Sequence, residues 1–162
     1  ASGFTREFLD ENAGGGFESD APIFIVGLPR SGSTLIEQIL ARMELSGDRA
    51  EGLMQDETGH VIEGTMTNLF VVSRGTLLTP DLSRSGVAGV MRDLVLERAP
   101  ALSIDCRVAG LKRESVLDAD EVFLTNSLIG VWPVRRIEAR EYPAGPITRR
   151  IQEAVRDATV AD

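Results

Sequence analysis

Apolar residues recur along the chain at two different spacings, and the change from one to the other predicts the order of strands and helices. Residues 21–28, APIFIVGL, form a short apolar run with β-branched residues, which favours a buried strand over 23–28. Residues 33–45, STLIEQILARMEL, repeat apolar positions on one helix face, so a helix should follow a tight turn. The polar break at 46–52 is the expected linker to the rest of the chain.

Beyond residue 53 the pattern is one of short strands, glycine turns and flanking helices. Thr58-Gly59 and Arg74-Gly75 supply the turns of two hairpins. The later expected elements are a helix over 86–99 that ends before Pro100, a strand at 105–111, a short helix over 112–121, an extended pair or one long bent strand at 121–142, and a closing helix over 147–158. The pattern therefore predicts an α/β or α+β domain of mixed, mostly antiparallel sheets with flanking helices, preceded by a strand–loop–helix unit.

Composition narrows the classes of partner. The chain has 162 residues, 17 basic and 25 acidic, and a net charge of −8, which argues against a broad nucleic-acid or anionic-membrane surface. No apolar run approaches the about 18 residues of a membrane span, and the first residues lack the apolar core of a secretory leader. Cys106 is the only cysteine, so we expect no internal disulfide and a cytoplasmic location. One His and one Cys give no support to a metal site.

The loop GLPRSGST, residues 27–34, is the first stretch with candidate chemistry. It nearly matches the phosphate-binding loop G-x-x-x-x-G-K-[ST], but the lysine is missing and Arg30 lies inside the loop. A strand, a tight turn and a helix would point backbone N–H groups outward, and Arg30 could pair with a phosphate or sulfate. The spacing alone leaves two interpretations open, an anion site or an ordinary strand-to-helix turn.

The stretch SDAPIFIVGLPRSGSTLIEQIL, with FTREFL and GGGF upstream, resembles the N-terminal phosphosulfate loop of bacterial sulfotransferases. That resemblance implies that the donor PAPS binds at Arg30, Ser31, Gly32, Ser33 and Thr34. The remainder of a sulfotransferase site has no counterpart in the residues that follow. A sulfotransferase-like PAPS-binding protein is therefore an alternative function for the chain.

The longer segment from about residue 51 to 137, with MQDETGHVIEGTMTNLFVV and FLTNSLIGVWPV, resembles the C-terminal domain of class IV pyridoxal-phosphate enzymes, within them aminodeoxychorismate lyase. The resemblance implies that Glu63, from the motif E-G-x-x-[ST]-N-[LI]-F, keeps the pyridine nitrogen of the cofactor PLP protonated. It implies phosphate contacts at Gly89, Val90, Asn126 and Ser127. Taken singly, Glu63 also fits a surface acid at a strand edge, and Ser127 fits a turn hydroxyl.

The departures from this second family bear on catalysis. Its members carry the lysine that holds the cofactor just before a helix that reads K-H-L-N-R-L-E-Q-[VIL]-L-A-R, and counting back from Glu37 puts Ser31 at that place. The only lysine, Lys112, is expected on a distant strand-to-helix turn. His60 is expected to be a turn histidine rather than an acid–base group. No counterpart of the family's N-terminal domain, with its phosphate-binding arginine, is evident.

These observations divide the chain into a sulfotransferase-like segment, 1–42, and a class IV aminotransferase-like domain, 43–162. The expected function is a PLP-dependent aminodeoxychorismate lyase of 4-aminobenzoate and folate biosynthesis, or a D-amino-acid or branched-chain-type aminotransferase, impaired by the missing lysine. The alternatives are the PAPS-binding protein and a non-catalytic hybrid fragment. The expected ligand is a small molecule. Apolar residues near Leu69, Phe70, Leu128 and Trp132 should be partly uncovered, which favours a homodimer or other self-association.

Overall fold

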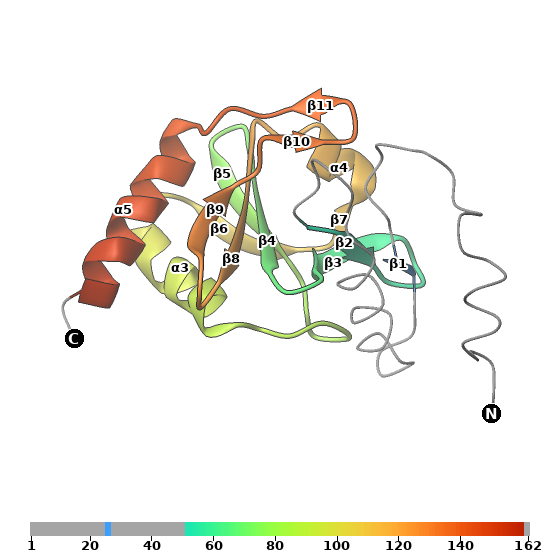
Figure 1. Ribbon diagram of the computed structural model, residues 1–162, viewed down its shortest axis with the longest axis horizontal. Coiled ribbons are helices and arrows are strands. Elements are labelled where there is room, and N and C mark those ends of the chain that lie inside the picture. Colours follow the sequence, from blue (N-terminus) through green and yellow to red (C-terminus); the bar gives the residue numbers. More distant parts are fainter. Residues whose placement is uncertain (1–24, 27–50, 161–162) are drawn as a thin grey trace, which may run out of the picture.

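The computed structural model describes residues 25–26 and 51–160, which form a five-stranded sheet with a four-stranded sheet beside it and helices at the flanks (Figure 1). The five-stranded sheet has the order β6-β5-β4-β8-β9, and its pairs are antiparallel except for β5 with β6. Its strands are β4 (Asn68–Ser73), β5 (Thr76–Pro80), β6 (Cys106–Ala109), β8 (Glu121–Asn126) and β9 (Gly130–Pro133). The expected α/β class with mixed sheets and flanking helices is confirmed.

The smaller sheet has the order β1-β2-β3-β7. Its strands are β1 (Ile25–Val26), β2 (Leu53–Gln55), β3 (His60–Gly64) and β7 (Leu111–Lys112). β1 pairs in parallel with β2 at the edge of the sheet. Met54 faces Glu63 and Gln55 faces Val61, so β3 carries one extra residue, Ile62. Such a bulge bends the strand and re-aims the neighbouring side chains.

Three helices and a small hairpin complete the described part of the chain: α3 (Val90–Ala101), α4 (Arg113–Leu117), α5 (Pro146–Val160), and the pair β10 (Arg136–Ile137) and β11 (Arg140–Glu141). None of these helices is long and apolar enough to cross a membrane. The helix expected over 86–99 begins at Val90, because Gly89 is extended and Gly86 has a φ of +97°. It also includes Pro100, which the sequence placed beyond its end. A proline in the last turn removes only one helical hydrogen bond.

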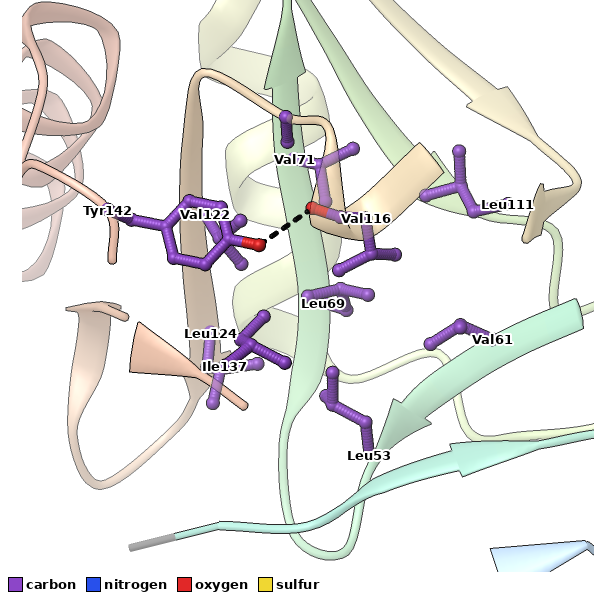
Figure 2. Close-up of a cluster of buried hydrophobic side chains, with 11 residues drawn as sticks. Leu53, Val61, Leu69, Val71, Leu111, Val116, Val122, Leu124, Ile137 and Tyr142 are labelled. Carbon is purple, nitrogen blue, oxygen red and sulfur yellow. Dashed lines mark hydrogen bonds between the residues drawn. The ribbon is translucent and has the colours of Figure 1, made fainter. Parts of the chain in front are cut away.

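Two hydrophobic cores lie on the opposite faces of the five-stranded sheet, and β4 contributes to both. Phe70 and Val72 of β4 face α3 and α5, and the rings of Phe70 and Phe123 stack with centroids 5.0 Å apart. Leu69 and Val71 face the other core (Figure 2). That core contains the residues Leu53, Val61, Leu69, Val71, Leu111, Val116, Ala119, Val122, Leu124, Ile137 and Tyr142.

This arrangement corrects part of the expected exposure. Leu69 and Phe70 are fully buried, because β4 is the central strand and both of its faces are covered. Leu128, in contrast, is 94% exposed in the turn between β8 and β9. Trp132 is partly buried against the core that contains Leu69 and Val71. Leu128 is thus exposed in a turn and Val108 of the edge strand β6 is 49% exposed, whereas the central strand β4 is covered.

Glycines lie in the hairpin turns and at the point where the chain passes from one sheet to the other. Arg74 and Gly75 have φ of 50° and 80°, the backbone of a tight hairpin turn whose twist matches that of the strands. The strand expected at 105–111 divides at Gly110 into β6 of one sheet and β7 of the other. A side chain at Gly110 would lie 3.2 Å from Cδ2 of His60, so the crossing passes close to that ring. The expected helix of the strand–loop–helix unit lies outside the described residues.

Candidate functional site

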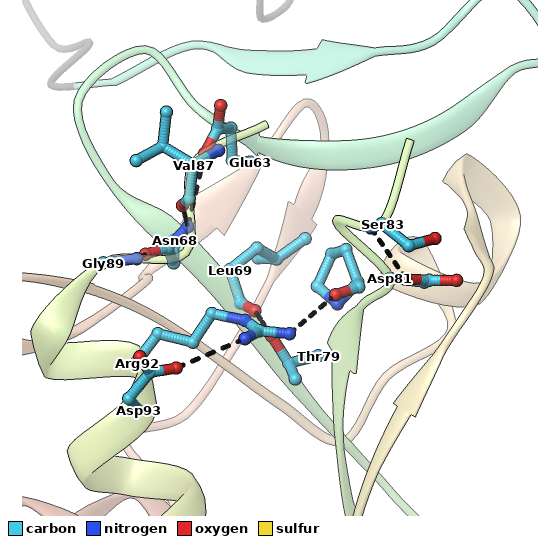
Figure 3. A network of polar contacts seen from close by, with 11 residues as sticks. Glu63, Asn68, Leu69, Thr79, Asp81, Ser83, Val87, Gly89, Arg92 and Asp93 are labelled. Atoms are coloured by element: carbon cyan, nitrogen blue, oxygen red, sulfur yellow. Dashed lines mark hydrogen bonds and ion pairs between the residues drawn. The ribbon is translucent and has the colours of Figure 1, made fainter. Parts of the chain in front are cut away.

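The turn between β3 and β4 separates two polar side chains, Glu63 and Asn68, that face the loop before α3 (Figure 3). The carboxylate of Glu51, which precedes β2, holds this turn through hydrogen bonds. Its Oε1 accepts hydrogen bonds from the Thr65 N–H at 3.0 Å and from the Thr65 hydroxyl. Its Oε2 accepts the Thr67 hydroxyl at 3.0 Å. The spacing between Glu63 and Asn68 is therefore set by a carboxylate from another part of the chain.

Glu63 and Asn68 form one hydrogen-bonded network with the loop. Oε2 of Glu63 accepts the Val87 N–H at 3.0 Å and Nδ2 of Asn68 at 3.3 Å. The same Nδ2 donates to the Val87 carbonyl at 2.7 Å, and Oδ1 of Asn68 accepts the Gly89 N–H at 3.0 Å. The network joins a carboxylate on the four-stranded sheet to the residue that begins α3.

α3 begins without a side-chain cap. Gly89 is its N-cap residue, with φ −76° and ψ 149°, and no side chain accepts a hydrogen bond from the first turn as a cap. The first N–H groups of a helix have no partner within the helix and lie at the positive end of its dipole, which favours an anion. A Cβ at Gly89 would lie 2.6 Å from Oδ1 of Asn68, so the close approach of this loop requires glycine.

A buried arginine lies in the first turn of the same helix. Arg92 is only 7% exposed, and its Nε and Nη2 donate to the Thr79 hydroxyl at 3.3 Å and the Pro80 carbonyl at 3.1 Å. Nη1 is 3.6 Å from the carboxylate of Asp93. Nearby, hydrogen bonds from Ser83 hold the pKa of Asp81 below its usual value, and the charge of Arg92 lowers it further. The start of α3 is therefore anchored to β5, and the charge of Arg92 is paired with that of Asp93.

The end of β8 lies beside the start of β4. Thr125 is opposite Asn68 in the register, and Nδ2 of Asn126 donates to the Met66 carbonyl at 3.4 Å. Oδ1 of Asn126 accepts two N–H groups of the following turn at 3.0 and 2.7 Å, and Ser127 is exposed in that turn. The Thr125 hydroxyl is buried and has no hydrogen-bond partner among the described residues.

Of the residues singled out in the sequence, Glu63, Gly89 and Val90 come together around one network at the start of α3. Asn126 and Ser127 lie at the neighbouring strand end, where Asn126 holds its own turn together. The assignment of cofactor contacts to these residues stays a prediction. Arg30, Ser31, Gly32, Ser33 and Thr34 lie outside the described residues.

His60 and Lys112 form a separate region at the other end of β3. Lys112 is exposed, pairs with His60 in the register, and is the N-cap residue of α4. Nδ1 of His60 is 2.7 Å from the Thr58 hydroxyl, which donates to Asp56. His60 thus belongs to the hairpin turn. Across residues 25–26 and 51–160, no group of three His, Cys, Asp or Glu side chains could hold a metal ion.

Three residues of the site were not singled out from the sequence: Glu51, Asn68 and Arg92. Asn68 lies within the motif that identified Glu63, so its place in the pattern was a usable signal. Glu51 and Arg92 gave no such signal, because the hydrogen-bond partners of Glu51 in the turn are 14 and 16 residues away along the chain and those of Arg92 are 12 and 13 residues away.

Residues 32–137 match the sequence model of the family described as amino-transferase class IV. The chain is 46% identical over 122 residues to an aminodeoxychorismate lyase of Vibrio harveyi, covering 72% of this chain and 45% of that protein. It is 36% identical over 138 residues to a branched-chain-amino-acid aminotransferase of Salmonella typhimurium, covering 83% of this chain and 45% of that protein. The chain thus spans about half the length of the curated relatives it matches.

Solved structures give the same picture. The crystal structure of 4-amino-4-deoxychorismate lyase from Pseudomonas aeruginosa superimposes with a TM-score of 0.72 at 40% identity, over 85% of this chain and 54% of that chain. The branched-chain aminotransferase of the archaeon Thermoproteus uzoniensis, solved with norvaline, gives 0.75 at 26% identity, over 88% and 52%. None of these four relatives supports a sulfotransferase. The family match also begins at residue 32, within the segment 1–42 that the sequence assigned elsewhere.

Proposed function

The chain belongs to the amino-transferase class IV family, and on that premise we propose that it is the cofactor-holding part of a PLP-dependent lyase of the aminodeoxychorismate lyase type. The observation that carries this proposal is the network of Glu63, Asn68 and Val87 beside the uncapped start of α3. Identity to the Vibrio harveyi lyase exceeds identity to the Salmonella typhimurium aminotransferase, which favours lyase over transaminase chemistry.

The residues present fit the two polar ends of PLP. A half-buried carboxylate held by two donors, as Glu63 is, would keep a proton on a pyridine nitrogen. The N–H groups of the first turn of α3, from Val90 onward, would bind the phosphate, because the Gly89 N–H already donates to Asn68. Glycine at position 89 lets this loop approach Asn68 closely. When bound, PLP supplies an electron sink for the carbon–hydrogen bond that is broken in an amino-acid substrate. Asn126 and Ser127 would complete the phosphate side.

The family lysine limits what this site does. That lysine serves as a nucleophile and then as a base, and both roles need a primary amine within reach of the cofactor. Ser31, at its expected place, has no amine. Lys112 pairs with His60 in the register, at the opposite end of β3 from Glu63. We therefore propose that the chain holds PLP noncovalently and does not convert aminodeoxychorismate to 4-aminobenzoate and pyruvate at an enzyme-like rate. The same limit applies to transaminase activity.

Titration with pyridoxamine 5′-phosphate tests the proposal, because this form of the cofactor needs no lysine to bind. We expect saturable binding to one site, measured as the change in fluorescence during the titration. Glu63→Gln should weaken binding by about tenfold or more, since a hydrogen bond to a charged group contributes roughly 1.5–3 kcal/mol. Glu153→Gln, a matched change at an exposed position of α5, should leave the affinity unchanged.

Two results would contradict the proposal: a folded protein without saturable binding, or equal affinities in wild type and Glu63→Gln. Adenosine 3′,5′-bisphosphate serves as the second ligand. If it binds tightly while pyridoxamine 5′-phosphate does not, the PAPS-binding alternative at residues 30–34 replaces this one.

A further inference from the structure

We propose that Asn68 is a positioning residue that couples the carboxylate at the cofactor ring to the start of α3, where the N–H groups from Val90 onward would bind the phosphate. This inference rests on the proposed function. One amide makes all the connections: Nδ2 donates to Glu63 at 3.3 Å and to the Val87 carbonyl at 2.7 Å, while Oδ1 accepts the Gly89 N–H at 3.0 Å. Figure 3 shows the side chain between the carboxylate and the start of α3.

Asn68 is more deeply buried than either residue it connects, Glu63 or Gly89. It is 6% exposed and begins β4, the central strand, where its register partner on β8 is Thr125. On its other side, the turn from Gly64 is closed by a hydrogen bond from the Gly64 N–H to the Thr67 carbonyl at 2.7 Å, and Glu51 binds the same turn. The loop before α3 can therefore be positioned from β4 rather than the reverse.

The amide side chain is suited to this role because it has both donors and an acceptor. An aspartate would keep an acceptor for the Gly89 N–H but would lose the donors to Glu63 and to the Val87 carbonyl. A leucine of similar size would lose all three hydrogen bonds. The contact with Gly89 is also close, since a Cβ there would lie 2.6 Å from Oδ1 of Asn68.

A consequence follows for binding. If Asn68 positions Glu63, the benefit of the Glu63 carboxylate should depend on Asn68. Residues in one hydrogen-bond network show non-additive effects, whereas independent sites add. A residue that only supports the fold would lower stability without making the effect of Glu63→Gln smaller.

The test is a double-mutant cycle of Asn68→Leu and Glu63→Gln, measured as the affinity for pyridoxamine 5′-phosphate. Asn68→Leu should lower the affinity by about tenfold or more. In the Asn68→Leu background, Glu63→Gln should cost clearly less than it does alone. Gln152→Leu is the matched control, because it removes an α5 amide that donates to the Val131 carbonyl at 3.0 Å. Its affinity should equal that of wild type.

A second measurement needs no ligand. In Asn68→Leu, amide hydrogen exchange at Gly89 should be faster by about fivefold or more, because its acceptor is gone. Asn68→Asp should keep wild-type exchange at Gly89 and still lower the affinity. If Asn68→Leu does not fold, Asn68→Asp takes its place in the same double-mutant cycle with Glu63→Gln.

The outcomes separate the two proposals. Additive effects in the cycle, with a wild type that binds, would overturn the positioning role and leave the proposed function standing. Unchanged exchange at Gly89 in a folded Asn68→Leu would overturn it whether or not the ligand binds. Absence of binding in the wild type would instead contradict the proposed function.

Discussion

Tyr142 shows how burial sets the chemistry of a single residue. Its ring lies in the core that contains Leu69 and Val71, and its hydroxyl donates to the Val116 carbonyl at 3.1 Å (Figure 2). The Leu117 carbonyl also accepts this hydroxyl, at 3.3 Å. Burial raises the pKa of this phenol to about 12, and the nearby charge of Arg140 offsets the rise in part. The folded protein thus favours the neutral phenol.

Alkaline stability should therefore depend on Tyr142. Between the ordinary phenol pKa of about 10 and the folded value of about 12, the unfolded chain loses the proton while the folded chain keeps it, so the free energy of unfolding falls as pH rises. Tyr142→Phe should remove this decline and cost about 0.5–1.5 kcal/mol at neutral pH. Urea unfolding at several pH values measures both the decline with pH and the cost at neutral pH.

Because the chain has one tyrosine, phenolate absorbance reports the titration of Tyr142 directly. Ionisation near pH 10 in the folded protein would contradict the burial.

At the scale of single residues, the sequence predicted which residues belong to the candidate site better than it predicted their contacts. Glu63 and Gly89 stood out through a motif and a turn, and both lie in the network. The role of Asn68 could not be read locally, because its partners Val87 and Gly89 are 19 and 21 residues away. Only the pairing of β4 with its neighbours brings them to the same amide.

α5 depends on a carboxylate from a strand. Glu121 of β8 is 5% exposed, and its oxygens accept the N–H groups of Ile147 at 3.2 Å and Thr148 at 2.8 Å, and the Thr148 hydroxyl at 2.7 Å. A negative charge at a helix N-terminus is favourable, and both oxygens of this buried carboxylate accept hydrogen bonds. Gly145 allows the approach, since a Cβ there would lie 2.1 Å from Cδ of Glu121.

Replacing this cap should loosen α5. Glu121→Gln removes the charge and one acceptor, so we expect a loss of about 1–3 kcal/mol in the free energy of unfolding. Glu153→Gln, at an exposed position of α5, is the control and should change stability little. Urea denaturation of the two variants gives the comparison. Equal midpoints would show that the carboxylate does not stabilise the helix.

Element prediction succeeded where periodicity and turn chemistry agreed. The closing helix, expected over 147–158, spans Pro146–Val160, and the glycines near residues 59 and 75 mark the two expected hairpins. It failed at α3, where Gly86 and Gly89 belong to the loop and delay the helix to Val90. Tertiary contacts decided that boundary, because this loop is held by Asn68 and Glu63.

On the scale of the whole molecule, most of the exposed large apolar residues in the described part of the chain lie near the candidate site. Met66, Val87, Val90, Leu128 and Ile129 are 47–94% exposed and lie in turns or at a helix start around that site. Val108, 49% exposed, is the exception, because it lies on β6 at the edge of the five-stranded sheet. The cores explain why the sheet itself is covered, which the sequence could not show for Leu69 and Phe70. Self-association through the exposed residues stays a prediction.

We propose, as the central claim, that a class IV site persists in this chain without the lysine that normally acts there. The most direct measurement is borohydride reduction of the protein saturated with PLP, followed by intact mass and peptide mapping. We predict saturable, reversible binding and no stoichiometric covalent adduct, because Ser31 has no amine and Lys112 faces His60. A single stoichiometric adduct on Lys112, lost together with lyase activity in Lys112→Ala, would contradict this claim. It would show that the chain has built its active site around its only lysine.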